Sequence, residues 1–290
     1  MAGRRSSPLK RWCVVLRAYS WPASLAPALV GAAAAARHGR FSAPDLALTL
    51  LAALLAHSGA NLANTYFDFI KGVDGPQADD RGLVDGLMEP RPMLALAAGL
   101  FAAGGAIGLL LVVKNGIPGL LWLGAAGFAL AWTYTGAGVA YKYRALGDAG
   151  IFLTFGPGIT AGSALIQARA LVPEALWLSI PMGLLITAIL HANNMRDEAG
   201  DASSGVSTLA GRLGRGASMR LYHAMVFVPY LFTLTLGSPW PPALCALSLP
   251  LAFRLRSLAA RGLLSELVPA TAALVAAFGV LLSAGLLLAA

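Results

Sequence analysis

The sequence predicts an all-α fold, a polytopic membrane bundle of nine transmembrane helices. Hydrophobic residues make up 58% of the 290 residues and charged residues only 12%, whereas about 25% of the residues of a soluble domain are charged. So few charges cannot cover a soluble surface, and so apolar a chain is not disordered. Nine apolar stretches, most of them near the roughly 20 residues that cross a bilayer, follow one another along the chain.

The nine predicted helices follow from the positions of these apolar stretches. The spans are placed at about 14–36, 46–70, 92–113, 117–136, 148–167, 175–195, 217–236, 240–255 and 267–290. The first contains Arg17, Pro22 and Pro27. Because more spans follow it, we interpret it as a membrane helix rather than a cleaved signal peptide.

The connections between the spans are short, except for 71–91 and 196–216. No stretch has the composition of a separate soluble domain. Residues 1–290 are therefore expected to form a single membrane domain, which starts with a short basic segment at 1–12.

The basic residues predict the orientation of the bundle. Nine spans place the two ends of the chain on opposite sides, and 17 of the 21 Lys and Arg residues then fall on the N-terminal, inner side. The four on the outer side are Arg37, Arg40, Lys114 and Arg169. This asymmetry is typical of cytoplasmic loops, so the net charge of +8 indicates orientation in a lipid bilayer rather than binding to nucleic acid.

The acidic residues gather in two groups on the inner side. Nine of the 13 Asp and Glu residues belong to these groups. The first group, at the end of the second span and in the loop after it, contains Asp68, Asp74, Asp79, Asp80, Asp85 and Glu89. The second, expected in the loop after the sixth span, contains Asp197, Glu198 and Asp201.

A polar stripe leads into each acidic group. His57, Asn61, Asn64 and Asp68 are spaced 4, 3 and 4 residues apart, which places them on one face of a helix. The corresponding residues of the sixth span are His191, Asn194, Asp197 and Asp201, with Asn193 beside them. Polar side chains in membrane helices usually face the bundle interior or a wet cavity, so we expect the stripes to face one another. The two histidines are expected to be packing residues rather than metal ligands.

Two clusters of acidic residues at the mouth of an apolar cavity predict a particular chemistry. Carboxylate and amide oxygens suit Mg²⁺, which prefers a few carboxylates together with waters and substrate phosphate oxygens. The inner side also offers cations that could clamp a diphosphate, namely Lys71, Arg81, Lys142 and Arg196. The pattern indicates an enzyme that ionises an allylic diphosphate. The alternatives are a proton-coupled carrier, whose acids should lie near the bilayer midplane, a non-catalytic lipid-binding subunit, and acidic loops that are merely solvated.

Five separated motifs resemble the UbiA superfamily of intramembrane prenyltransferases, from about residue 12 to the C-terminus. The motifs are NLANTYFDFIKGVD at 61–74, DDRGLVDGLMEP at 79–90, YKYRALGD at 141–148, FLTFGP at 152–157 and HANNMRDEAGD at 191–201, the last followed by STLAGRLG. They are most similar to the branch that prenylates naphthoquinol rings, in animals and bacteria.

The resemblance implies nine transmembrane helices around a central cavity, with Mg²⁺ and a prenyl diphosphate held by two Asp-rich motifs. By position, the first motif is Asn64, Asp68 and Asp74, and the second is Asn193, Asn194, Arg196, Asp197 and Asp201. Lys142 and Tyr143 match a basic-aromatic pair of the family. Two positions depart from the common first motif, Thr65 and Gly72, which leaves open whether Asp74, Asp79 or Asp80 completes the first metal site.

These matches imply a role for each residue. Asp68, Asp74, Asp197 and Asp201 are the expected Mg²⁺ ligands. Lys142 and Arg196 would neutralise the diphosphate, and the expected substrate-binding side chains are Asn61, Asn64, Tyr66, Tyr143, Asn193 and Asn194. Tyr66, Tyr141 or Tyr143 would present a ring face to the allylic cation, and the sequence does not identify the base.

The resemblance implies Mg²⁺-dependent transfer of a polyprenyl group, geranylgeranyl or longer, to menadiol or 1,4-dihydroxy-2-naphthoate in menaquinone (vitamin K2) biosynthesis. The nearest alternatives are 4-hydroxybenzoate, haem or chlorophyllide as the acceptor. No Lys or Arg lies in the middle of a predicted span, and an unpaired buried carboxylate is costly, so a neutral ring is favoured. The expected location is the endoplasmic reticulum or Golgi membrane in a eukaryote and the cytoplasmic membrane in a bacterium, with the N-terminus and the acidic loops in the cytoplasm.

Overall fold

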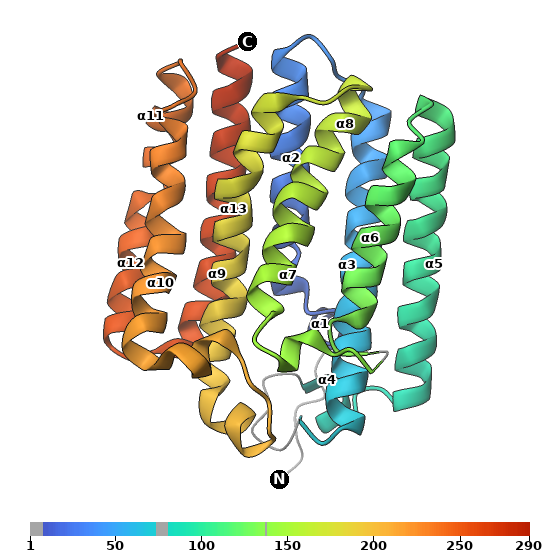
Figure 1. Cartoon of the computed structure of the whole chain (residues 1–290), viewed down its shortest axis with the longest axis vertical. Coiled ribbons are helices and arrows are strands. Elements are labelled where there is room, and N and C mark those ends of the chain that lie inside the picture. Colours follow the sequence, from blue (N-terminus) through green and yellow to red (C-terminus); the bar gives the residue numbers. More distant parts are fainter. Residues whose placement is uncertain (1–7, 74–80, 137) are drawn as a thin grey trace.

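The computed structural model describes residues 8–73, 81–136 and 138–290, and this part of the chain is a bundle of upright helices (Figure 1). The long helices run between two ends, which we call lower and upper as in Figure 1. The elements are α1 Pro8–Val15, η1 Ala18–Ser20, α2 Pro22–Arg37, α3 Ala43–Ile70, α4 Arg81–Val84, α5 Pro90–Asn115, α6 Gly119–Thr133, η2 Tyr141–Tyr143, α7 Gly147–Leu153, η3 Thr154–Ala161, α8 Gly162–Ala168, α9 Pro173–Ser203, α10 Leu209–Thr233, α11 Trp240–Ala246, α12 Leu249–Ala260 and α13 Leu264–Leu288.

Each predicted span contains a helix or a chain of short helices, but the count of nine crossings is not confirmed. Among the described residues, five units are long and apolar enough to cross a membrane: α3, α5, α7 to α8, α9 and α13. A sixth is added if α11 and α12, bent by 44° at their junction, form one span. The helix α6 has 15 residues and α2 has 16, which is short of a full span.

Local breaks interrupt the helices at three places. The first predicted span starts within α1, turns at Arg17, whose φ is 52°, and continues as α2 from Pro22. The fifth becomes π-helical over η3, which contains Pro157. The helix α10 is kinked at Gly214, whose φ of 70° lies in the left-handed region that glycine tolerates.

The second acidic group lies on a helix, contrary to the prediction of a loop from 196 to 216. The helix α9 continues to Ser203, and α10 starts after Thr208, whose hydroxyl accepts a hydrogen bond from the Gly211 amide. The side chains of Asp197 and Asp201 are therefore fixed on the last turns of α9. The prediction was wrong because apolar content fails to mark the end of a helix that extends beyond the hydrocarbon.

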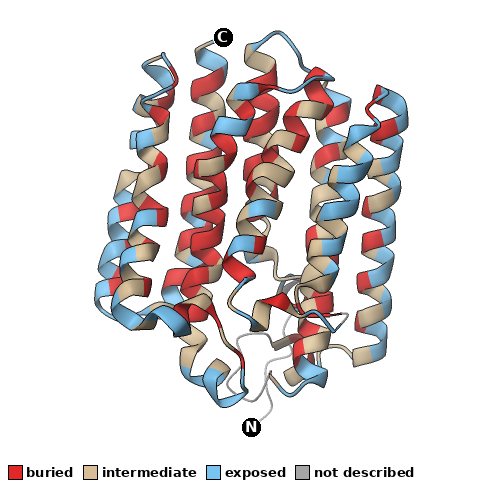
Figure 2. Ribbon diagram, viewed as in Figure 1, coloured by how far each residue is buried: buried red, intermediate tan, exposed pale blue. Residues whose placement is uncertain are grey.

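The core of the bundle lies around α9 and α13. In α9, 72% of the apolar window is buried inside the bundle, and the buried residues of α2, α9, α10 and α13 form one large cluster. A smaller cluster joins α1, α3, α4 and α5. Figure 2 shows buried residues concentrated on the central helices and exposed residues on the outer ones.

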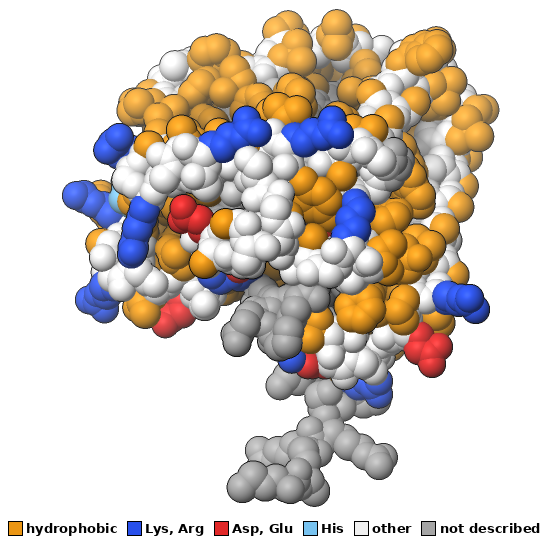
Figure 3. All heavy atoms as spheres, turned by 60° about the horizontal axis from the view of Figure 1, so that its bottom comes forward, with side chains coloured by type: hydrophobic (Ala, Val, Ile, Leu, Met, Phe, Trp, Pro, Cys, Tyr) orange, Lys and Arg blue, Asp and Glu red, His pale blue; other side chains and the backbone are white. Residues whose placement is uncertain are grey.

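The flanks of the bundle are apolar, as a lipid-facing surface must be. Large hydrophobic side chains are exposed there, among them Trp122 at 81%. The view of the lower end shows Lys, Arg, Asp and Glu side chains on that end, beside an apolar flank (Figure 3). The described chain is therefore an integral, multi-pass membrane protein.

Cysteine labelling can test whether both acidic connections lie on one side of the membrane. Asp85 follows α4 and Ser204 follows α9, both at the lower end (Figure 1). In a variant with Cys13 and Cys245 replaced, we expect a membrane-impermeant maleimide to label cysteines at positions 85 and 204 from the same side. The control is a cysteine at Leu171, which is 72% exposed in the connection after α8 and should be labelled from the other side. Labelling of positions 85 and 204 from opposite sides would exclude a shared site.

Candidate active site

A cavity of about 1080 Å³ lies between the two apolar clusters. Its walls come from α2, α3, α5, α6, the unit from α7 to α8, and α9. Its volume is at the upper end of the range typical of ligand pockets. Its deep part is mainly apolar, and its charged lining residues are Arg17, Asp68, Lys142, Arg196, Asp197 and Asp201.

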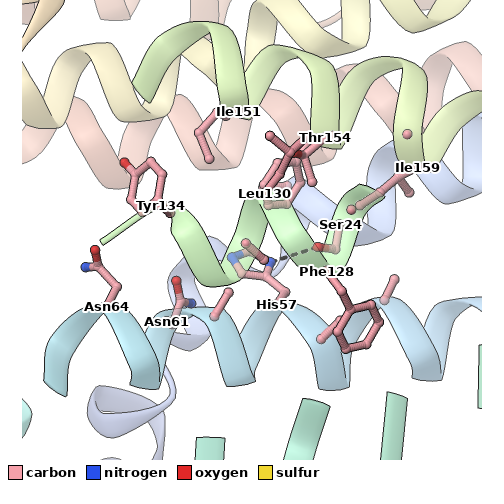
Figure 4. Close-up of a pocket in the computed structure, with 18 of the residues that line it drawn as sticks. Ser24, His57, Asn61, Asn64, Phe128, Leu130, Tyr134, Ile151, Thr154 and Ile159 are labelled. Carbon is pink, nitrogen blue, oxygen red and sulfur yellow. Dashed lines mark hydrogen bonds between the residues drawn. The ribbon is translucent and has the colours of Figure 1, made fainter. Parts of the chain in front are cut away.

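The helix α3 supplies one wall of the cavity. His57, Asn61, Asn64 and Asp68 all line it, which confirms that the stripe predicted from their spacing faces the bundle interior. Figure 4 shows His57, Asn61 and Asn64 in succession along this helix, pointing into the cavity. The stripe thus changes from imidazole and amide groups in the deep part to a carboxylate at the lower end of α3.

Asp68 is bound by two side chains of the η2 segment. Lys142 Nζ donates a hydrogen bond to Asp68 Oδ2 at 2.7 Å, and the Tyr143 hydroxyl donates to Asp68 Oδ1. The Asp68 side chain is only 3% exposed, so this ion pair is shielded from solvent. The pair joins residues 74 positions apart in sequence, and it places a cation at the lower mouth of the cavity.

Burial and charge act in opposite directions on Lys142. Burial alone would lower the pKa of Lys142, but the Asp68 carboxylate, aided by Asp201, outweighs it and shifts this pKa above its usual value. Lys142 is therefore an ammonium ion at neutral pH. A fixed positive charge at this position suits the binding of a phosphate group.

The helix α9 supplies the opposite acidic wall. Arg196 Nε donates to Asp197 Oδ1 at 2.8 Å, and the Asn193 amide donates to Asp197 Oδ2 at 3.0 Å. Arg196 also donates to the Asn193 amide oxygen at 2.7 Å. Asp201 lines the cavity one helical turn further on. Asp197 is thus paired with the guanidinium of Arg196 on this wall, as Asp68 is paired with the ammonium of Lys142 on the other.

A buried hydrogen-bonded pair supports α9 behind the cavity wall. His191 Nδ1 donates to Asp148 Oδ2 at 2.6 Å, and the Asn194 amide donates to Asp148 Oδ1 at 3.2 Å. All three side chains are buried, but of the three only Asn194 lines the cavity. His191 therefore points away from the cavity, and Asp148 orients the Asn194 amide.

The donor groups at the mouth fit Mg²⁺ bound jointly with a diphosphate. The Asn64 amide oxygen is buried without a hydrogen-bond partner within the described residues, which leaves it free to bind a cation. In the part of the chain that the structure describes, no three His, Cys, Asp or Glu side chains converge as a metal cage. Mg²⁺ does not require such a cage, because it keeps waters and binds one or two carboxylates together with substrate phosphates.

The structure brings most of the predicted site residues to one cavity. The lining includes Asn61, Asn64, Asp68, Lys142, Asn193, Asn194, Arg196, Asp197 and Asp201. Asp74, Asp79 and Asp80 lie outside the described residues, so the choice among them stays open. Lys71 does not line the cavity, because it donates to the Thr135 carbonyl. Arg81 does not line it either and pairs with Asp85 on the surface.

Of the three tyrosines predicted to face the allylic cation, only Tyr141 lines the cavity, and Tyr134, which was not predicted, lines it too. Tyr66 and Tyr143 do not line it. The two lining rings lie 5.4 Å apart, and Lys142 Nζ is 5.9 Å from the centre of the Tyr134 ring. Burial raises the pKa of Tyr141 to about 12, so its ring stays neutral. Tyr134 was missed because it stands alone at the end of an apolar helix.

Backbone hydrogen bonds join the η2 segment to the connection after α9. The Ala145 amide donates to the Ser207 carbonyl at 2.6 Å, and the Ser207 amide donates to the Tyr143 carbonyl at 3.2 Å. These bonds link the segment that carries Lys142 to the connection that follows the acidic end of α9. The two sides of the mouth are therefore held together directly.

Comparison with known proteins identifies the family. The sequence pattern of the UbiA prenyltransferase family matches residues 24–263. The chain belongs to the UbiA prenyltransferase family. Two relatives, both called UbiA prenyltransferase domain-containing protein 1, are similar over most of the chain. The protein from Danio rerio is 37% identical, with 88% of this chain and 78% of the relative covered, and the one from Homo sapiens is 36% identical, with 84% and 73% covered.

Solved UbiA structures share the fold. The apo structure of a UbiA homologue from Aeropyrum pernix K1 has a TM-score of 0.73 at 20% identity, over 92% of this chain and 97% of the homologue. A UbiA homologue from Archaeoglobus fulgidus, bound to DMAPP and Mg²⁺, has a TM-score of 0.63 at 15% identity, over 94% and 99% of the two chains. At these identities the likeness shows that the bundle has the UbiA fold.

Proposed function

We propose that this UbiA family member transfers a prenyl group from an allylic prenyl diphosphate to a naphthoquinol ring, with Mg²⁺ as the cofactor. The observation that carries the proposal is the meeting of Asp68, Lys142, Asp197 and Asp201 at the mouth of one apolar cavity. The whole chain, 1–290, would act as a single domain with nine crossings, and its lower end would face the cytoplasm.

The lower mouth suits the diphosphate of the donor. Asn64 and Asp68 on one wall, and Asp197 and Asp201 on the other, would hold Mg²⁺, which when bound stabilises the negative charge of the leaving diphosphate. Lys142 and Arg196 would donate hydrogen bonds to its oxygens. The Archaeoglobus fulgidus homologue has been solved with DMAPP and Mg²⁺ and with GPP and Mg²⁺, which supports this donor chemistry.

The apolar part of the cavity suits the prenyl chain. Its wall on α5 and α6 is built from small, aliphatic and phenylalanine residues, including Gly104, Gly108, Leu109, Leu121 and Phe128. Such a wall offers no group that would capture the allylic cation. The cavity volume supports a donor of geranylgeranyl length or longer, and the rings of Tyr134 and Tyr141 would stabilise the cation by facing it.

The distribution of charge supports a neutral acceptor. The charged lining residues are those of the lower mouth together with Arg17 at the start of η1. In the deeper part, the polar lining residues of α2 and α3 carry hydroxyl, amide and imidazole groups. Because burying an unpaired carboxylate is costly, a neutral ring such as menadiol fits best, or a 1,4-dihydroxy-2-naphthoate whose carboxylate stays at the mouth.

Competition between acceptors tests this proposal. Purified protein in detergent or nanodiscs is given Mg²⁺, geranylgeranyl diphosphate and equal concentrations of menadiol, 1,4-dihydroxy-2-naphthoate and 4-hydroxybenzoate. We expect prenylated naphthalene products to exceed prenylated hydroxybenzoate by at least about tenfold, since a buried carboxylate without a partner costs more than 1.4 kcal/mol. The products are measured by mass spectrometry. A majority of prenylated hydroxybenzoate would contradict the proposed acceptor, while leaving the transfer of a prenyl group intact.

A further inference from the structure

A polar cluster lies in the deep part of the cavity, away from the acidic mouth. It consists of Ser20 at the end of η1, Ser24 on α2, and His57 and Asn61 on α3, and we call it the His57 cluster. All four residues line the cavity. None of them carries a charge that would suit a diphosphate, so the cluster calls for another ligand.

Hydrogen bonds within the cluster fix the roles of its atoms. The Ser20 hydroxyl donates to the Arg17 carbonyl at 2.8 Å, so the Ser20 oxygen is an acceptor towards its other neighbours. It receives the Asn61 amide N–H at 3.1 Å and faces His57 Nε2 at 3.3 Å. His57 Nε2 therefore carries the hydrogen, and Nδ1 accepts from the Ser24 hydroxyl at 2.8 Å (Figure 4).

Two groups of the cluster remain available to a ligand. The hydrogen on His57 Nε2 faces only Ser20, at the long distance of 3.3 Å, so this weak bond can be exchanged for one to a ligand. The Asn61 amide oxygen accepts no side-chain hydrogen bond from the described residues and is not sealed from the cavity. One is a donor and the other an acceptor, and they lie one helical turn apart on α3. A hydroxyl group, which both donates and accepts, matches this pair.

The position of the cluster suits a ring that reacts near the diphosphate. His57 and Asp68 are eleven residues apart on one helix, which corresponds to about 16 Å along its axis. That distance leaves room for the diphosphate, the allylic carbon and a flat ring between them. The facing wall on α5 and α6 lacks hydroxyl groups among its lining residues, so the prenyl chain and the polar edge of the ring have different walls to lie against.

We propose that the His57 cluster is the subsite that binds one hydroxyl group of the aromatic acceptor, with His57 Nε2 donating a hydrogen bond to the hydroxyl oxygen and the Asn61 amide oxygen accepting a hydrogen bond from the hydroxyl. This inference rests on the proposed function and adds the recognition element for the acceptor. It makes His57 and Ser24 specificity-determining residues, because Ser24 holds the imidazole in the required orientation.

The proposal is tested with menadiol and its two monomethyl ethers, each of which lacks one hydroxyl proton. The variants are His57→Phe, which keeps a ring beside Phe155 at the 5.2 Å contact, and Ser24→Ala. The control is Thr49→Val, because Thr49 lines the same wall of α3 and bonds only to its own helix, at the Asp45 carbonyl. For each protein, kcat and KM are measured for acceptor and donor, together with the Tm.

With menadiol we expect His57→Phe to lose about 10- to 100-fold in kcat/KM for the acceptor, as for a lost hydrogen bond that leaves a buried partner unpaired. The donor KM, the Tm and the Thr49→Val control should stay within about twofold of wild type. One of the two ethers should be about as poor a substrate for the wild type as menadiol is for His57→Phe. With that ether, His57→Phe should lower kcat/KM little further, because the ether and the substitution remove the same hydrogen bond and their effects are not additive.

Equal losses by His57→Phe on menadiol and on both ethers would overturn the subsite, as would two ethers that react like menadiol in the wild type. If His57→Phe does not fold, Ser24→Ala decides in the same way, with an expected loss of about tenfold. A wild-type protein that prenylates none of these rings would instead refute the proposed function, and the subsite with it. The assay of the wild-type protein therefore distinguishes a failure of the proposed function from a failure of the subsite.

Discussion

Replacing Asp68 with Asn is expected to lower kcat/KM for prenyl transfer by about 100- to 1,000-fold, the scale seen when charge stabilisation of a transition state is lost. The Asn side chain keeps the shape of Asp68 and can still accept a hydrogen bond from Lys142, so the bundle should fold. It removes the negative charge that a divalent cation requires at the mouth. The measurement is single-turnover transfer at saturating Mg²⁺, with the Tm recorded in parallel.

The matched control is Asp85→Asn. Asp85 belongs to the same acidic group in the sequence, but it pairs with Arg81 on the surface and does not line the cavity. This variant should keep at least about half of the wild-type rate, because exposed ion pairs contribute little. An Asp68→Asn protein that works at near-normal rates would contradict the placement of the metal site, and equal losses in both variants would indicate a general effect of inner-side charge.

Replacing Lys142 with Met should weaken donor binding, with a rise of about 10- to 100-fold in the KM of the prenyl diphosphate. A charge-assisted hydrogen bond contributes about 1.5–3 kcal/mol, and the methionine keeps most of the length of the side chain. Its loss also leaves the buried Asp68 without the ammonium ion that now lies 2.7 Å away. Isothermal titration with a non-hydrolysable prenyl diphosphate analogue, in the presence of Mg²⁺, measures this effect directly.

Arg144→Met is the control for this variant. Arg144 follows η2 two residues after Lys142, is exposed, and does not line the cavity. Its loss should change analogue binding by less than about twofold. Unchanged binding in Lys142→Met would show that the ammonium ion serves only to neutralise Asp68, and that the other basic lining residues, Arg17 and Arg196, supply positive charge to the diphosphate.

The sequence predicted the lining of the cavity best where helical periodicity was strong. Asn61, Asn64 and Asp68 recur at intervals of three and four residues, and one helix face carries all of them into the cavity. The same rule was weaker on α9, where Asn193 and Asp197 line the cavity but His191 turns towards Asp148. The spacing of residues along a helix predicts which of them share a face, but it does not predict which other element packs against that face.

Contacts between distant segments could not be predicted from the sequence. The pairs Lys142–Asp68 and His191–Asp148 each join two different elements. The Ser24–His57 contact depends on where the chain turns at Arg17 before α2 starts. Helix ends were also predicted poorly, since α9 extends to Ser203 through a polar sequence. Composition reports the membrane environment, whereas these features depend on capping and on tertiary contacts.

The backbone bonds between Ala145, Ser207 and Tyr143 have a mechanical consequence. They make the connection of residues 204–208 and the η2 segment move as one body, because shifting either one breaks hydrogen bonds that have no replacement in a partly dry region. A displacement of this connection, for example by an inserted residue, is therefore transmitted through the backbone to the segment that carries Lys142. The acidic end of α9 and the segment with Lys142 thus form one structural unit, so a change in the position of either wall of the mouth reaches the other.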